Sequence, residues 1–564
     1  MAGCFCLATI VVVGSAVVPA SASVKGGFLH DRGELVQDHA SFDEDVAVAV
    51  AEALLGAADR MESIEQSLQP MWHALPKVGG RIEVLSLRRL AYRYFMHHYS
   101  IMIRGFEPTR VVNRTHWGVA DILSEYVPNY VEAVLQSQHE LQKGFTLRDA
   151  ATLVAVLENL ISDSDAALLQ KVYLKQYKPM ARSLYASRLQ QVLEDYMVNW
   201  MVADDPDSIQ HVLANRSLLF ESFPHWRDIV DFLRGQVKTF AYGQRKSVTG
   251  RTSKGADLLG NSYSFADAES IVGGITRSFA RFWESECIDM KSQLVDLDVD
   301  ATGRVPLSVF YKAAMQSEWR FGESEAYLRE LGALDDTSRS GPKVIIPNYM
   351  QGASNCIVPA GHYLVCCASE CEGILGELEQ AIKAPLAMPE EILAVVGNMT
   401  LQSHLDKDEP IRLQGTLTNQ LHKVAEAHGG RVPLQGRLFA QWLHYVFPRE
   451  CPYPHKAGLA TAQTPSQFGG QYLATSDEMR AHAGRASAAG MLPSVMNDTE
   501  WMAQWSHEEE LVGEHIELRA PWEKCHMLVM YTIGLFALGV AAGVISIRSG
   551  KLASGPGAGK VHSV

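Results

Sequence analysis

The chain has 564 residues, of which 47% are hydrophobic and 20% are charged. This composition supports buried cores in about three or four domains and excludes a chain that is disordered throughout. Lys and Arg number 50 against 64 for Asp and Glu, which gives a formal net charge of -14. This acidic balance argues against nucleic acid as a partner, because nucleic-acid binding requires a basic surface.

Both ends of the chain carry apolar segments typical of targeting. Residues 1–22 form an apolar run that closes on Ala-Ser-Ala, a pattern typical of a signal peptide and its cleavage site. Residues 526–548 hold an uncharged apolar stretch long enough to cross a bilayer as a helix. The basic tail, residues 549–564, would face the cytoplasm. The sequence thus predicts a type I single-pass membrane protein of the secretory pathway or cell surface, with its main part lumenal or extracellular.

This topology has two consequences. Gly539 and Gly543 form a GxxxG pattern in the predicted membrane helix, which would let two copies pack as a homodimer. Candidate N-glycosylation sites fall in the predicted lumenal part, at Asn113, Asn215, Asn398 and Asn497.

Residues 23–242 are expected to form a helical domain. Thr146 and Asp149 fit a capping box, and the apolar residues that follow are spaced by three and four, which places them on one face of a helix. No sustained alternation with a period of two occurs here, so we expect a helical bundle. Residues 243–263 are rich in Gly, Ser and Thr and are expected to be a linker.

A second domain is expected over residues 264–455, starting from a capping pattern at Ser264 and Asp267. A stalk of small and polar residues, 456–525, would join it to the membrane. In an oxidising compartment the cysteines of this domain predict up to three disulfides, with the connectivity left open. Four of them, Cys366, Cys367, Cys371 and Cys451, could instead form a zinc site together with His362 and His455. The cysteines are Cys287, Cys356, Cys366, Cys367, Cys371 and Cys451.

Residues 298–309 follow the pattern of a calcium-binding loop flanked by helical sequence. Oxygen-bearing side chains occupy loop positions one, three and five, Gly303 permits a sharp turn at position six, and position seven offers a main-chain carbonyl. Calcium prefers six to eight oxygen ligands, so these groups are candidates for a weak calcium site. The candidate ligands are Asp298, Asp300, Thr302 and, through its carbonyl, Arg304.

Over residues 275–350 or so, the sequence resembles the EF-hand superfamily, in a form similar to EF-hand-containing single-pass membrane proteins of unicellular eukaryotes. Because EF-hands usually occur in pairs, residues 335–349 are interpreted as a second, degenerate hand. A third, partial repeat occurs at Gly430, where Gly-Arg-Val-Pro-Leu matches the Gly-Arg-Val-Pro-Leu that starts at Gly303. The sequence departs from the family pattern at Val309, where the family has a glutamate that binds calcium through both oxygens.

These features together predict a mainly α protein: a helical bundle, an EF-hand-like domain with disulfides and one C-terminal membrane helix. The leading hypothesis is a membrane-anchored binding or scaffolding protein with weak calcium binding. Two alternatives stay open, a lumenal enzyme that uses the Cys- and His-containing region, and a purely structural surface protein with a calcium-free EF-hand scaffold. No familiar catalytic motif occurs, so no catalytic residue is predicted.

Overall fold

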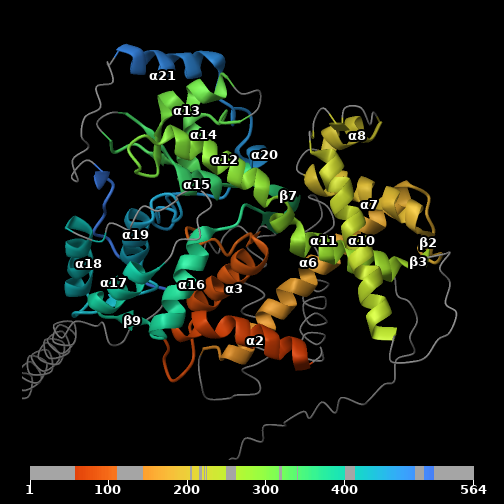
Figure 1. Cartoon of the computed structure of the whole chain (residues 1–564), viewed down its shortest axis with the longest axis horizontal. Coiled ribbons are helices and arrows are strands. Elements are labelled where there is room, and N and C mark those ends of the chain that lie inside the picture. Colours follow the sequence, from red (N-terminus) through yellow and green to blue (C-terminus); the bar gives the residue numbers. More distant parts are fainter. Residues whose placement is uncertain are drawn as a thin grey trace, which may run out of the picture.

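The computed structural model shows a mainly helical chain, which confirms the predicted fold class at that level (Figure 1). Among the helices described, none is long and apolar enough to cross a membrane. The predicted signal peptide, membrane helix and cytoplasmic tail lie outside the described residues. The structure describes residues 58–110, 144–203, 206–214, 219–220, 223, 225–248, 262–316, 320–338, 341–399, 413, 415–488 and 501–512.

Long helices from the first half of the chain build the first hydrophobic core. The predicted capping box is present at the start of α6, where the Asp149 carboxylate accepts the Thr146 main-chain N–H at 2.7 Å and the Thr146 hydroxyl accepts the Asp149 N–H at 3.3 Å. The helices are α2 (Ala58–His73), α3 (Val84–Tyr99), α6 (Leu147–Lys175), α7 (Ala186–Met201), α8 (Pro206–Ala214), α10 (Trp226–Val248) and α11 (Phe265–Phe282).

Helix α11 lies on the far side of the predicted linker but belongs to this first core. Its predicted capping box, Ser264 with Asp267, is present. Phe279 of α11 is fully buried, and its ring centroid lies 5.0 Å from that of Trp200 on α7. The expected boundary at residues 243–263 therefore does not separate the two cores, because packing assigns the helix after it to the first one.

A short sheet also joins the two halves of the chain. The central strand β8 (Tyr363–Val365) pairs antiparallel with β1 (Ile101–Ile103) on one side and with β7 (Ile357–Ala360) on the other. Ile101 lies opposite Val365 in this register. A second small sheet pairs β2 (Leu184–Tyr185) with β3 (Ser262–Tyr263).

Beyond α11, two helix–strand–helix units pack as a first pair. The short strands that follow each loop run antiparallel, with Val305 of β4 opposite Val344 of β6, and both side chains are fully buried. This first pair comprises α12 (Glu284–Leu297), β4 (Arg304–Pro306), α13 (Leu307–Ala314), α14 (Glu325–Glu330), β5 (Leu334–Asp335), β6 (Lys343–Ile345) and α15 (Ile346–Met350).

Two more helix–strand–helix units form a second pair with the same plan. Val432 of β10 lies opposite Ala387 of β9. The repeat that starts at Gly430 therefore occupies, in β10, the place that its counterpart occupies in β4. This second pair comprises α16 (Glu370–Ile382), β9 (Leu386–Ala387), α17 (Pro389–Asn398), α18 (Thr416–Ala427), β10 (Val432–Pro433) and α19 (Arg437–Val446).

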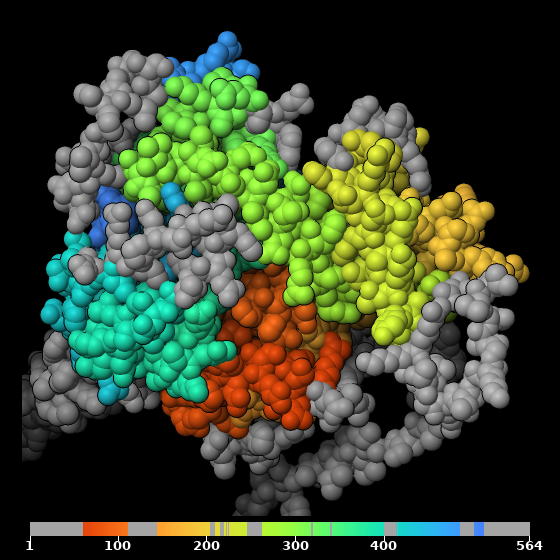
Figure 2. All heavy atoms as spheres, in the orientation of Figure 1, coloured from red at the N-terminus to blue at the C-terminus, as the bar shows by residue number. Residues whose placement is uncertain are grey.

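Parts of the predicted stalk pack back onto these pairs, which the stalk interpretation did not anticipate. Helix α21 (Ser476–Ala488) packs against α13, and Figure 2 shows it in blue on the green surface of the first pair. The phenol ring of Tyr327 contacts Phe468 of α20 (Pro465–Phe468), with ring centroids 4.7 Å apart. Residues 501–512 pack on the second pair, where Arg437 donates to the carbonyl oxygen of Glu508 at 2.8 Å.

Candidate functional site: the Asp298 loop and its arginine

The Asp298 loop, residues 298–303, joins the end of α12 to β4. Asp298 is buried, and its carboxylate accepts the main-chain N–H groups of Thr302 at 3.0 Å and of Gly303 at 2.8 Å. Gly303 has φ +68°, a conformation that glycine adopts without strain. The predicted turn is therefore formed, and the first carboxylate of the loop organises its backbone.

The same carboxylate forms an ion pair with an arginine in the segment that follows the second pair. The Nε atom of Arg449 lies 3.1 Å from Oδ2 of Asp298, whose side chain is 0% exposed. Arg449 also donates to the carbonyl oxygen of Asp298, at 3.4 Å. A guanidinium group thus sits beside the carboxylate at which a calcium ion would begin its coordination.

Close main-chain packing holds the Arg449 segment against this loop. A Cβ atom at Gly303 would lie 1.9 Å from the carbonyl oxygen of Pro448, so only glycine fits there. Two residues beyond Arg449, Cys451 forms a disulfide with Cys371 of α16. The position of the arginine is therefore fixed from both sides.

The second unit of the first pair repeats this arrangement. Asp335, the leading aspartate of the predicted degenerate hand, accepts a hydrogen bond from Nε of Arg304 at 2.9 Å, and both side chains are buried. Its other oxygen accepts the N–H and hydroxyl of Thr337 at 2.9 and 2.6 Å. Each leading aspartate of the first pair is thus neutralised by an arginine.

The structure brings together some of the predicted calcium ligands. The hydroxyl of Thr302 donates to Oδ1 of Asp298 at 3.3 Å, and both residues are buried. Asp300 is exposed to solvent. Val309, at the twelfth loop position, lies in α13 and has no oxygen side chain. Within the described part of the chain, no group of three or more His, Cys, Asp and Glu side chains is arranged to hold a metal ion.

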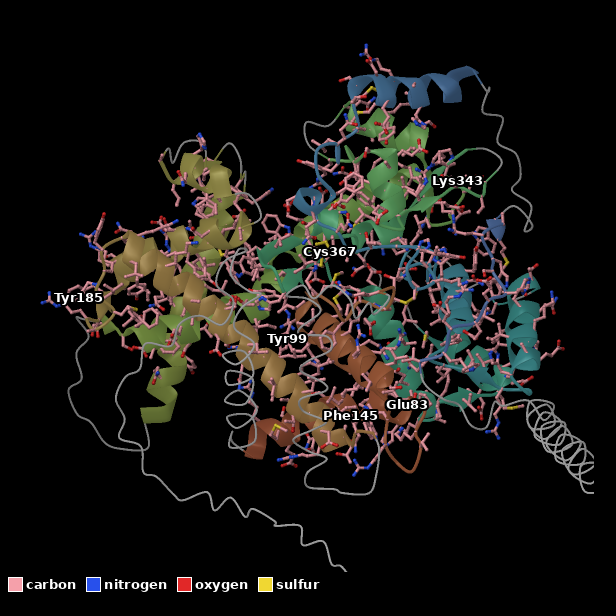
Figure 3. The ribbon with its side chains drawn as sticks, turned by 180° about the vertical axis from the view of Figure 1, so that it is seen from behind. Glu83, Tyr99, Phe145, Tyr185, Lys343 and Cys367 are labelled. Carbon is pink, nitrogen blue, oxygen red and sulfur yellow. A yellow bond between two sulfur atoms is a disulfide. The ribbon has the colours of Figure 1, made fainter. Side chains whose placement is uncertain are left out.

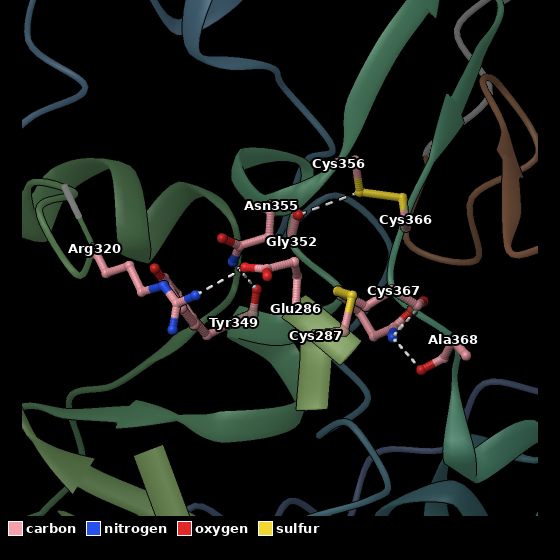
Figure 4. The surroundings of a disulfide bond; sticks show 11 residues. Glu286, Cys287, Arg320, Tyr349, Gly352, Asn355, Cys356, Cys366, Cys367 and Ala368 are labelled. Carbon is pink, nitrogen blue, oxygen red and sulfur yellow. Dashed lines mark hydrogen bonds and ion pairs between the residues drawn. A yellow bond between two sulfur atoms is a disulfide. The ribbon is translucent and has the colours of Figure 1, made fainter. Parts of the chain in front are cut away.

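All six cysteines predicted to form disulfides are paired, as Cys287–Cys367, Cys356–Cys366 and Cys371–Cys451. The two that involve Cys366 and Cys367 lie side by side where β8 ends (Figure 4). Figure 3 shows Cys367 in the interior of the molecule, whereas Tyr185 lies at its edge. In this arrangement none of these sulfurs is a thiolate, which a zinc site would require.

The histidines of the zinc alternative are buried and neutral. Burial lowers the pKa of His362 to about 3. Burial also lowers the pKa of His455, whose Nε2 lies 2.7 Å from the carbonyl oxygen of Gly332. His444, which is not part of that alternative, contacts the carbonyl oxygen of Cys451, and its pKa is lowered by burial and by nearby Arg304. The contacts of His455 and His444 are those of packed core histidines.

Of the candidate glycosylation sites, Asn398 lies at the exposed end of α17. The other three fall outside the described residues, as do the two glycines of the predicted dimer contact.

Arg449 was missed by the sequence reasoning, although it decides the electrostatics of the loop. It lies 151 residues from Asp298 and belongs to no motif. The sequence held one indication of its position, the repeat at Gly430. This repeat indicates a further helix–strand–helix unit, and Arg449 lies in the segment directly after that unit. Arg304 was considered only for its carbonyl group, whereas its side chain makes the ion pair.

Comparisons of this chain with protein-family models, with curated proteins and with solved structures find no match.

Proposed function

We propose that this chain is a membrane-anchored binding or scaffolding protein of the secretory pathway or cell surface, built on EF-hand-like pairs that fold without calcium. The observation that carries the proposal is the pairing of both leading aspartates with arginines, Asp298 with Arg449 and Asp335 with Arg304. A buried carboxylate requires a counter-charge. In this protein the chain itself supplies that charge.

The EF-hand-like character is supported by the alternation of helix, loop and short strand in both pairs. Val305 and Val344 meet between antiparallel strands in the first pair, as Val432 and Ala387 do in the second. Such pairs bury their apolar helix faces against one another and against neighbours, which suits a scaffold. The three disulfides support an oxidising compartment.

A second candidate function is weak calcium binding at the Asp298 loop. It is favoured by the convergence of the Asp298 carboxylate and the Thr302 hydroxyl, 3.3 Å apart, in a loop that already has the required glycine turn. For calcium to bind there, it would have to displace the guanidinium group of Arg449.

Calorimetric calcium titration of the full chain separates the two candidates. The comparison uses the parent, Asp298→Asn, and Asp300→Asn, which changes an exposed loop residue and leaves the fold undisturbed. Asp296→Asn, an exposed residue at the end of α12, is the matched control. We expect no saturable heat in any of them up to about 5 mM, beyond the weak end for EF-hand modules.

Saturable heat in the parent and in Asp296→Asn that disappears in both loop variants would overturn the calcium-free proposal and establish the second candidate. Heat that persists in every variant would show that calcium binds elsewhere in the chain and would leave the loop calcium-free.

A further inference from the structure

A cavity of about 250 Å³ lies where the first core and the two helix–strand–helix pairs meet. Helix α3 forms one wall, α16 and α19 form another, and residues 452–462 close the third side. Its lining is largely apolar and includes Met96, Met102, Leu375, Phe439 and Leu443. This volume corresponds to about eight water molecules in the liquid, and a methylene group is of similar size to a water molecule.

Most polar side chains that line the cavity are already bonded within the protein. Asn348 donates to the carbonyl oxygen of Tyr453 at 3.0 Å and accepts its N–H at 2.7 Å. Arg93 donates to Glu372 at 2.7 Å. The ring of His455 contacts the carbonyl oxygen of Gly332. These groups shape the wall and have little hydrogen-bonding capacity left for a ligand.

Two donors on α3 keep such capacity. Arg89 uses its Nε atom to donate to the side-chain oxygen of Gln435 at 2.8 Å, and within the described residues its two terminal nitrogens have no hydrogen-bond partner. Tyr92, three residues further along the same helix, lines the cavity, and its hydroxyl has no hydrogen-bond partner in the described part of the chain. Residues spaced by three lie on one face of a helix, so both donors serve the same wall.

Charges of both signs act on Arg89 and Tyr92 at this point. Arg93 is the cation that acts on Arg89, and its own carboxylate partners are Glu372 and Glu379. Burial and then the charge of Arg93 lower the pKa of Arg89, and the two glutamates act in the opposite direction with smaller individual effects. Glu372 and Glu107 also act on Tyr92, so the feature that favours an anion here is the pair of terminal Arg89 nitrogens, which have no hydrogen-bond partner within the described residues.

We propose that this cavity binds a small monocarboxylate with an apolar tail of about eight carbons, its carboxylate held by Arg89 and Tyr92 and its tail packed against the methionines and leucines of the lining. A guanidinium group presents paired N–H donors that match a carboxylate. The walls are largely apolar, so a polar ligand without a tail gains little there. This ligand site is separate from the Asp298 loop and is independent of whether calcium binds.

The test uses the full chain in lipid nanodiscs, with octanoate titrated calorimetrically at pH 7 and empty nanodiscs as the blank for partitioning. Octanamide and octylammonium have the same tail with a neutral and a cationic head. We expect saturable binding of octanoate to the protein and binding at least about tenfold weaker for the other two, because a charge-assisted pair is lost.

Three variants locate the site. Arg89→Met keeps the length of the side chain and removes its charge, and we expect it to weaken octanoate binding at least about tenfold. Ala440→Phe fills the cavity from α19 without touching Arg89, and we expect it to abolish binding. Arg234→Met makes the same charge change at an exposed position of α10 and should bind like the parent.

Three results would overturn the proposal: no saturable octanoate heat in the parent up to about 5 mM, equal affinity for octanoate and octanamide, or parent-like binding in Ala440→Phe. The comparison of ligands on the parent protein decides the head-group requirement even if Arg89→Met fails to fold.

Discussion

Arg93 on α3 contacts Glu379 on α16, with Nη1 2.5 Å from Oε1, although 286 residues separate them in the sequence. The Arg93 side chain is 4% exposed and that of Glu379 is fully buried. Burial disfavours the charge of Arg93, but Glu372 and Glu379 together raise its pKa above the ordinary value. This contact joins the first core to the second helix–strand–helix pair.

Removing the arginine should therefore destabilise the whole chain. Arg93→Met leaves the buried Glu379 carboxylate without its counter-ion, which costs about 3–5 kcal/mol in the free energy of unfolding. Urea unfolding of the full chain measures this change in the free energy of unfolding. Arg234→Met, which breaks an exposed pair, should stay within about 0.5 kcal/mol of the parent. Equal stability of the two variants would show that the buried pair contributes nothing.

Asp165 on α6 should make stability fall as pH rises through its folded pKa. Burial raises that pKa to about 6 from an ordinary value of 3.8, against the opposing effect of the hydroxyl groups bonded to the carboxylate. At low pH both folded and unfolded states hold the proton. As pH rises, the unfolded chain releases it first, so ionisation favours unfolding. The hydroxyl donors are Thr276 at 2.6 Å, Tyr363 at 2.7 Å and Tyr196 at 3.3 Å.

The difference between these two pKa values corresponds to about 3 kcal/mol in the free energy of unfolding. This stability is lost between about pH 4 and pH 7. Asp165→Asn keeps the size of the side chain and removes its titration. We therefore expect the stability of this variant relative to the parent to rise by about 3 kcal/mol over that range, measured by urea unfolding at each pH. A difference that is the same at pH 4 and pH 7 would contradict the assignment.

Gly303 and Gly430 form a matched pair for testing the contact between the Asp298 loop and the Arg449 segment. Both have positive φ, +68° and +92°, but a Cβ atom at Gly430 meets nothing within 4 Å, whereas one at Gly303 overlaps the carbonyl of Pro448. Gly430→Ala should cost about 1–2 kcal/mol from backbone strain alone. Gly303→Ala should lower the stability clearly more than Gly430→Ala, because it adds the overlap with Pro448 to the backbone strain. Thermal unfolding of the two variants measures the difference.

The disulfides should differ in how much they stabilise the chain. Cys371–Cys451 spans 80 residues, whereas Cys356–Cys366 spans 10. Loop-closure entropy predicts that replacing both cysteines of the longer loop by alanine costs about 2 kcal/mol more than the same change in the shorter one. Unfolding in urea gives the difference, and peptide mapping without reduction checks the pairing itself. A larger loss from the shorter loop would mean that strain or local packing outweighs chain entropy.

Local patterns allowed several features to be predicted from the sequence. The capping boxes at Thr146 and Ser264 depend on residues three apart, and both are present. The glycine turn at Gly303 is likewise a local requirement. Disulfides could be predicted for six cysteines because the prediction depends only on how many cysteines lie in an oxidising compartment. Their pairing depends on the fold, and the structure supplies it.

The contacts that the sequence could not predict all join distant segments. The placement of α11 in the first core, the return of residues 501–512 onto α19 and the pairing of Arg449 with Asp298 each depend on tertiary packing, which no local periodicity encodes. The same is true of the cavity at Arg89, whose walls come from three separate parts of the chain.

The sheet that joins β1 to β8 has a consequence for the order in which the protein forms during synthesis. Ile103 pairs with Tyr363, and translation at about 5–20 residues per second needs roughly 13–50 seconds to cover the 260 residues between them. Throughout that interval the hydrophobic strand β1 is already synthesised, but its partner strand β8 is not. The amino-terminal core is therefore completed only after well over half of the chain has been synthesised.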